Sequence, residues 1–326
     1  MATTNSITTT YAGEFAGEYI AAALTSGKTL NDGAIAIKPN VKFKEVLKNV
    51  SLTDAIKDAT CDFDPTSTVT LDERVLQPKE LQVNMQLCKS DFRSDWEAIS
   101  MGYSAHDNLP PNFADFIIGH VSAKVAESVE QNIWQGDDDG SGSHTLFDGF
   151  EQLISSSALS GVGSSTVDSG NVITFLGKIV DNIPTAVYGQ EDLTIYTPNN
   201  VYQAYVRALG GFAVKAYGSA GSESAAASVG ANGVDNKGTT FYGMNEGLTF
   251  DGIKLQRCPG MSSNRAVAAQ ASNLYFGTGL LADHNEVKLI DMADIDGSQN
   301  VRLVMRFTAG TQVGILSDAK HFTATT

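Results

Sequence analysis

The pattern of apolar and polar positions changes its period several times along the chain. Over residues 81–88 apolar side chains alternate with less apolar ones in the stretch LQVNMQLC. A period of two is typical of a strand with one face against protein and the other in water. Val69 and Leu71 repeat the pattern upstream, and Pro78 keeps the stretch between them out of the middle of a sheet. The pattern predicts an extended two-stranded arm, with strands that could begin as early as residues 54–64.

The strongest helix pattern covers residues 112–134. Asn112 is suited to the N-cap with Asp115 three residues later, and Gly136 follows the last apolar position. The direction of the apolar face turns gradually along this helix, through Phe113, Ile117, Val121, Val125, Val129 and Ile133. A helix of this kind is covered by different elements at its two ends, so we expect a central spine rather than a member of a bundle.

Shorter elements surround this helix in the sequence. A marginal helix is expected over residues 15–24, ended by Gly27, and a second over residues 171–183, where the apolar residues share one face. The strand-like LTIY of residues 193–196 leads into a third helix, which Pro198 opens and which ends before residue 210.

Two stretches rich in Ser, Gly and Ala, residues 155–170 and 210–240, predict loops. Short strand patterns return from residue 241 onward, and the clearest is the alternating VRLVMRF of residues 301–307. Strands and helices are interspersed without an internal repeat, which predicts an α+β fold.

The composition of the chain disfavours several classes of protein. The net charge of −15, from 37 acidic and 22 basic residues, disfavours a protein that grips phosphate groups, because each such contact needs Lys or Arg. The three cysteines, Cys61, Cys88 and Cys258, form no CxxC pair and predict neither a disulfide framework nor a zinc site. The first residues lack a signal-peptide pattern, and no run of about 18 apolar residues occurs, so we expect a chain that neither is secreted by a signal peptide nor spans a membrane.

An acidic cluster after the long helix offers candidate metal ligands. Its spacing matches calcium-loop positions 1, 3, 5, 6 and 12 at Asp137, Asp139, Ser141, Gly142 and Asp148. The last position should be a bidentate Glu, His144 stands where an apolar residue normally pairs with a sister loop, and no second loop occurs. The favoured interpretation is therefore a turn that leads out of the helix, with calcium binding as the alternative.

Other candidate chemistry is weaker still. Gly277, Gly279 and Ala282 have the spacing of a dinucleotide fingerprint but lack a clear βαβ unit around them. The five histidines form no HxH or HExxH pair, and no GxSxG elbow is present. We expect no catalytic, cofactor-binding or metal-binding residue, and no cofactor.

The order of these elements resembles that of the major capsid proteins of tailed bacteriophages, which share the Hong Kong 97 fold. The stretches that carry the resemblance are AESVEQNIWQGDDDGSG with the following LFDGF, then LTIYTPNNVYQAYVRAL, LTFDGIKLQRCPGM and SNLYFGTGL. The resemblance extends from about residue 50 to the end of the chain, and it depends on the order of the motifs more than on any one of them.

The resemblance implies an α+β capsid fold of the Hong Kong 97 type with five parts. These are an N-terminal arm (1–50), an extended β-hairpin loop (51–91), a peripheral domain (92–166 and 296–326), a spine helix within it (112–134), and an axial domain (167–295).

The implied function is self-assembly through hexamers and pentamers into the icosahedral head shell around double-stranded DNA, without catalysis. The implied location is the virion capsid, assembled in the bacterial cytoplasm. The expected partners are copies of the same chain and, non-specifically, packaged DNA, with scaffolding, portal and cement proteins as further candidates and no membrane. The candidate interface residues, on the predicted arm, are Arg74, Lys79, Glu80, Leu81, Val83 and Met85.

Two alternatives stay open. One is another phage structural protein, such as a tail or fibre component, which the strand-rich and Gly-rich C-terminal half permits. The other is a calcium-binding or metal-dependent protein that uses Asp137, Asp139 and Asp148.

Overall fold

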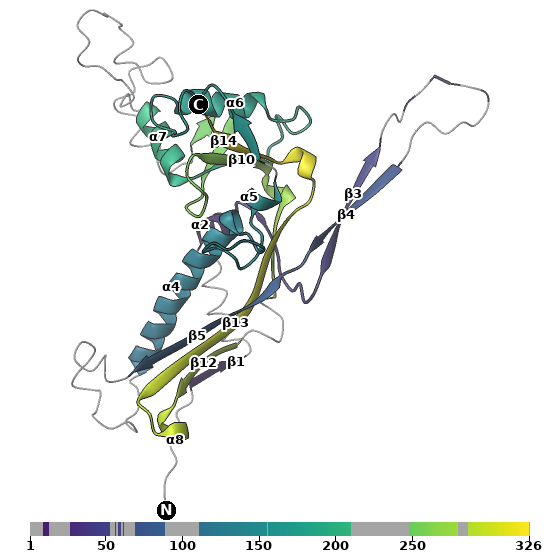
Figure 1. The fold of residues 1–326 in the computed structure, drawn as a ribbon. Helices are drawn as coiled ribbons and strands as arrows, with labels where there is room; N and C mark the ends of the chain where they lie inside the picture. Colours follow the sequence, from purple (N-terminus) through teal and green to yellow (C-terminus); the bar gives the residue numbers. More distant parts are fainter. Residues whose placement is uncertain are drawn as a thin grey trace, which may run out of the picture.

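The computed structural model shows two sheets, a long helix beside one of them, and a two-stranded hairpin that projects from the body (Figure 1). It describes residues 9–12, 27–52, 56, 58, 59, 61, 69–88, 111–154, 156–209, 248–279 and 286–325. The helix expected over residues 15–24 and the loop expected over residues 210–240 lie outside the described residues.

The first sheet is built around one long strand, β13, which pairs antiparallel with β5, β12 and β11. β1 extends the sheet beyond β12, and β2 runs parallel to β11. The strands are β1 (Thr9–Ala12), β2 (Ala36–Lys38), β5 (Lys79–Cys88), β11 (Leu274–Thr278), β12 (Glu286–Asp291) and β13 (Asn300–Val313). The alternation predicted for residues 81–88 is confirmed, because every second residue of β5 from Lys79 to Leu87 is half-buried and the residues between them are exposed.

The second sheet has the strand order β6-β14-β10-β7-β9-β8. Its strands are β6 (Ser156–Leu159), β7 (Leu193–Thr197), β8 (Thr249–Phe250), β9 (Ile253–Arg257), β10 (Arg265–Gln270) and β14 (Lys320–Ala324). Helices α6 (Val172–Asp181) and α7 (Asn199–Leu209) pack with this sheet around a shared core that includes Phe175 and Ile195. Both helices and strand β7 confirm the sequence predictions.

The long helix α4 (Pro111–Gln135) lies beside β5 and β13 (Figure 1). The large apolar residues predicted to form its face, Ile117, Val121, Val125, Val129 and Ile133, are buried in one core with residues of the first sheet. Near its C-terminal end Trp134 packs against Phe150 and Tyr196, with ring centroids 5.4 and 5.2 Å away. The turning apolar face therefore contacts different elements along the helix, as predicted.

Five short helices complete the described structure: α2 (Lys28–Asn31), α5 (Phe150–Leu153), α8 (Ala293–Asp296) and the 3-10 turns η3 (Ala271–Asn273) and η4 (Leu316–Asp318). One loop prediction is wrong in part, because β6 lies inside the stretch 155–170. Its sequence SSAL has no alternating pattern, and it becomes a strand by pairing parallel with β14.

The strands of the projecting hairpin differ from those expected. β4 (Val69–Leu76) pairs antiparallel with β3 (Glu45–Leu52), whereas β5 pairs with β13 in the body. The domain boundaries stay a prediction. Each sheet contains strands from both the predicted peripheral range (92–166 and 296–326) and the predicted axial range (167–295). In the second sheet β14 of the peripheral range lies beside β10 of the axial range, and in the first sheet β11 and β12 of the axial range pair with β13 of the peripheral range.

Candidate assembly surfaces

The β3–β4 hairpin has one apolar face. Residues directly opposite each other in an antiparallel pair carry their side chains on the same face. The register places three apolar pairs on this face, Val46 with Val75, Val50 with Leu71, and Leu52 with Val69. Lys48 and Glu73 form the remaining pair on this face and oppose each other with opposite charge.

This apolar face is open to solvent. The side chains are between 41% exposed at Val75 and 68% exposed at Leu71. The other face is mostly polar, with Asn49 opposite Asp72 and Ser51 opposite Thr70. A two-stranded ribbon is marginally stable alone in water, and this one extends beyond the body of the molecule (Figure 1). Its exposed face is therefore a candidate contact surface.

The root of the hairpin is held tightly. Leu76 is fully buried and lies against Gly277, where a Cβ would come within 3.0 Å of Leu76 Cδ2. Gln312 also holds the root: its Nε2 donates to the carbonyl of Val75 at 2.8 Å, and its Oε1 accepts from Arg74 Nη1 at 3.3 Å. These contacts fix the direction in which the hairpin leaves the body.

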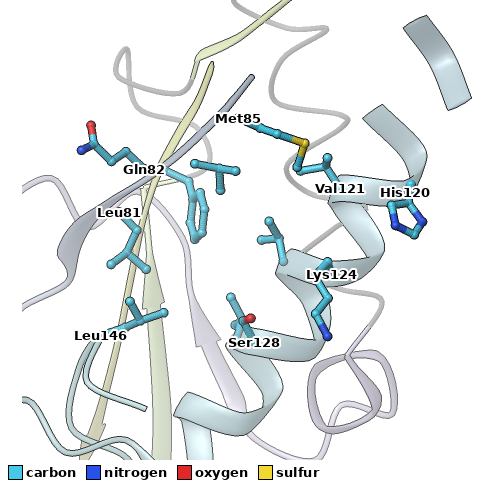
Figure 2. A pocket seen from close by; sticks show the side chains of 12 residues that line it. Leu81, Gln82, Met85, His120, Val121, Lys124, Ser128 and Leu146 are labelled. Atoms are coloured by element: carbon cyan, nitrogen blue, oxygen red, sulfur yellow. The ribbon is translucent and has the colours of Figure 1, made fainter. Parts of the chain in front are cut away.

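A second surface is an apolar groove of about 310 Å³ between β5 and α4. Figure 2 shows Leu81 and Met85 from the strand and Val121 and Ser128 from the helix on its two sides. We call it the β5–α4 groove. Its lining residues are Leu81, Gln82, Val83, Met85, His120, Val121, Lys124, Val125, Ser128, Val129, Leu146 and Phe307.

The predicted interface residues fall into two places. Leu81, Val83 and Met85 line the β5–α4 groove and pack partly against the core of their own chain. They lie on the body and not on the projecting ribbon, because β5 pairs with β13. Their role in assembly stays a prediction.

The charged members lie near the hairpin root. Arg74 bonds to Gln312, Glu80 is exposed, and Lys79 forms an ion pair with Asp138. The sequence interpretation missed β3 and its apolar side chains. A partial signal was present, since Val46, Val50 and Leu52 stand at even spacing, but the polar Lys48 interrupts this series.

The acidic stretch after α4 forms a turn that closes on itself. Asp148 Oδ1 accepts from the backbone N–H of Asp138 at 3.0 Å, and the N–H of Asp137 donates to the carbonyl of His144 at 2.9 Å. Gly136 and Gly149 approach so closely that a Cβ on Gly149 would lie 2.6 Å from Gly136 N. Over the part of the chain that the structure describes, no three His, Cys, Asp or Glu side chains gather where they could hold a metal ion.

A buried polar cluster joins the spine helix to α2. The carboxylate of Glu130 accepts from the N–H of Thr29 at 3.1 Å and from its hydroxyl, and the Thr29 hydroxyl accepts from Trp134 Nε1 at 2.9 Å. Burial raises the pKa of Glu130, and the bonds from Thr29 oppose that rise. The cluster satisfies these buried polar groups and fixes α2 on the helix.

A second buried cluster lies where β14 meets α5. His321 is 1% exposed, and neither of its ring nitrogens has a hydrogen-bond partner among the described residues. Glu151 and Arg265 form an ion pair of 2.8 Å beside it. Burial lowers the pKa of His321; Glu151 opposes this effect and Arg265 adds to it. Burial at this position therefore favours the neutral form of the imidazole.

Comparison with solved structures identifies the fold. The chain resembles a chain in the satellite phage P4 procapsid that includes the size determination protein, with a TM-score of 0.53, 9% identity, and 95% of this chain and 99% of that chain covered. It resembles the capsid of a native GTA particle with a TM-score of 0.58, 10% identity, and coverage of 93% and 90%. For Mycobacterium phage Adephagia the TM-score is 0.55, the identity 14%, and the coverage 92% and 90%.

No family model matches the sequence, and no curated protein matches it. The structural likeness covers nearly the whole chain at low identity, so it shows the fold: the phage-capsid fold expected from the sequence is confirmed. None of the described helices combines the length and the apolar character that a membrane crossing requires.

Proposed function

We propose that this chain is a major capsid protein, the subunit that forms the icosahedral head shell of a tailed phage. Copies associate through hexamers and pentamers, and the closed shell encloses double-stranded DNA. The virion capsid is then its location, and its principal partner is itself. Packaged DNA, held non-specifically, and scaffolding, portal and cement proteins are further partners that this function predicts.

The observation that carries the proposal is the apolar face of the β3–β4 hairpin, which is exposed in the single chain. Burying apolar surface is the dominant favourable term in most protein association, so this face gains free energy by lying on another molecule. An exposed face on a hairpin that projects from its own body is suited to a neighbour related by rotation, which is the arrangement that closes a shell (Figure 1). The capsid fold of the chain supports the same conclusion.

The negative net charge of the chain makes an apolar contact between copies more important for association. Copies that each carry −15 repel one another, and the repulsion is screened by salt. Apolar contacts supply attraction that does not depend on charge. Since each subunit in a shell has several neighbours, many weak contacts together give a stable lattice.

Substitution on the two faces of β4 tests the proposal. Leu71→Asp places a charge on the apolar face, whereas Thr70→Asp places the same charge one residue away on the polar face. Both positions are exposed, so both monomers should melt like the wild type. We expect electron microscopy to show shells for the wild type and Thr70→Asp, and none for Leu71→Asp.

Shells from Leu71→Asp in normal yield would contradict the role of the hairpin. If the wild-type protein gave tubes or fibres instead of closed shells, the protein would be a tail or fibre component.

A further inference from the structure

We infer that the face of the first sheet opposite α4 contacts the phosphate backbone of packaged DNA. The inference rests on the proposed function and adds to it the surface that meets the genome. We call this surface the amide–arginine face. Its residues are Gln82, Asn84 and Gln86 of β5, Lys288 of β12, and Arg302 and Arg306 of β13.

The register of three strands places these side chains on one face of the sheet. Each arginine of β13 lies directly opposite a glutamine of β5, and the row between them has Asn84 on one side and Lys288 on the other. Residues opposite each other in an antiparallel pair share a face, and so does every second residue along a strand. The six residues therefore form one continuous patch, and its two arginines are separated by about 14 Å along β13.

The patch is open to solvent, whereas the other face of the sheet is covered. Both arginines and the three amides of β5 are exposed, and Lys288 is partly exposed. Leu303 and Met305 alternate with the arginines and are buried in one core with α4. Gln82 borders the β5–α4 groove, but its amide points away from the helix (Figure 2). The face is therefore accessible to a partner that approaches from the side opposite α4.

All six side chains can donate hydrogen bonds. A guanidinium carries five N–H groups, an ammonium three, and each side-chain amide two. Proteins bind the phosphates of DNA with these side chains, and such contacts do not depend on base sequence. Arg302 Nε donates to Gln86 Oε1 at 2.9 Å, and this bond helps to orient the guanidinium on the sheet. The face is thus suited to a row of phosphate groups.

Charge on this face is opposite to that of the whole chain. The chain carries −15, whereas the face holds three basic residues. Glu80 and Glu286 stand at one end of it. Beyond the other end is Asp296, whose pKa is lowered by the hydrogen bond with Ser298 and by the charge of Arg302. The face attracts phosphates locally, and the acidic remainder of the chain keeps the total attraction weak.

The composition of the face favours nucleic acid over a second protein. The centre of a protein interface is typically depleted of charge and enriched in aromatic side chains. On the described part of this face, across β5, β13 and β12, no aromatic residue occurs. Its apolar members, Val304 and Ile290, are only partly exposed. A polyanion therefore matches this surface better than an apolar protein patch does.

The salt dependence of DNA binding tests the contact. The full-length protein, before assembly, is titrated into a short labelled DNA duplex at several salt concentrations. Each phosphate contact contributes about −0.9 to the slope of log K against log salt, so Arg302→Gln with Arg306→Gln should reduce the magnitude of the slope by about 1.8. The matched control is Arg207→Gln with Arg257→Gln, which removes the same charge from exposed positions on α7 and β9 and should leave the slope unchanged.

A second pair of variants adds charge instead of removing it. Gln86→Glu keeps an acceptor for Arg302 but neutralises its charge, so the slope should lose about 0.9 of its magnitude. Gln203→Glu makes the same substitution on α7 and is the control. All the substituted positions are exposed, so the melting temperatures should stay unchanged.

The outcomes separate the inference from the proposed function. Equal slopes for the face variants and their controls, or no binding of the duplex by the wild type at low salt, would overturn the inference alone. A map of wild-type shells with the amide–arginine face on the outer surface would do the same. If the double arginine variant melted normally but formed no shells, the face would be a contact between copies, which also overturns the inference. Failure of the unmodified chain to form shells contradicts the proposed function itself, whatever the slopes.

Discussion

Pro78 crosses over Gly310 so closely that a Cβ at residue 310 would lie 2.9 Å from Pro78 Cα. Gly310 pairs directly with Gly277, against which Leu76 packs. Two opposed glycines thus make a flat site on β11 and β13 where the chain passes from the hairpin into β5. This crossing sets where the hairpin leaves the body.

Gly310→Val should therefore displace the root of the hairpin. The obstructing atoms belong to the backbone of Pro78, so they cannot move aside as a side chain would. We expect a loss of about 1–3 kcal/mol in the free energy of unfolding, measured by urea denaturation. Gly142→Ala is the control, because a Cβ at residue 142 meets nothing within 4 Å. Equal stability of the two variants would show that the crossing is loose.

Thr29→Val should destabilise the attachment of α2 to the spine helix. It removes the hydroxyl that accepts from Trp134 Nε1 and donates to Glu130, and it leaves both groups buried. The expected loss is about 1–3 kcal/mol in urea denaturation. Thr29→Ser keeps the hydroxyl and should lose only about 1 kcal/mol for the missing methyl group. A larger loss from Ser than from Val would contradict the hydrogen-bond account.

His321 should make the protein less stable in acid. Its pKa is lowered in the folded state, so below its ordinary pKa the unfolded chain binds more protons than the folded one. The contribution to stability is thus complete above the ordinary pKa and is lost as the pH falls below it, by at most about 1.4 kcal/mol per pH unit.

Comparison with His321→Phe isolates this effect. We expect thermal unfolding between about pH 7 and pH 5 to depend less on pH in the variant, because Phe cannot take up a proton. Glu151 and Arg265 are present in both proteins, so the difference between the two pH profiles reports the loss of the imidazole. Parallel pH profiles would show that His321 does not contribute.

Calcium should not stabilise the acidic turn. Asp148 already accepts from the backbone of Asp138, and Asp138 forms an ion pair with Lys79. We expect titration calorimetry with calcium to give no binding heat and the melting temperature to stay constant. Binding that disappears in Asp139→Asn would instead establish a metal site here.

Much of the fold follows from periodicity. A period of two in residues 81–88 predicts a strand, and the helical spacing from Ile117 to Ile133 predicts a helix. Both patterns are local in the sequence, and both correspond to observed elements, β5 and α4. Strand partners were harder to predict, because Val69 and Leu81 belong to similar patterns. A period of two identifies a strand but not the strand beside it. Only the tertiary structure shows that β4 pairs with β3 and β5 with β13.

The same limit applies to the assembly surfaces. The apolar side of β3 can be read from Val46, Val50 and Leu52, but whether a face is covered depends on where the body of the protein lies. The β5–α4 groove depends on two segments whose separation no sequence pattern encodes. The sequence predicts that Leu81 and Val83 contact another subunit. In the structure both side chains pack partly against the core of their own chain.

The most direct test of the central claim, that a second copy covers the apolar face of the hairpin, is a cryo-electron microscopy map of shells assembled from this protein. The account predicts density for residues 45–52 and 69–76 on an adjacent subunit, with Val50 and Leu71 buried between the two chains. Hairpins that stand in solvent, or that fold back onto their own subunit, would contradict it.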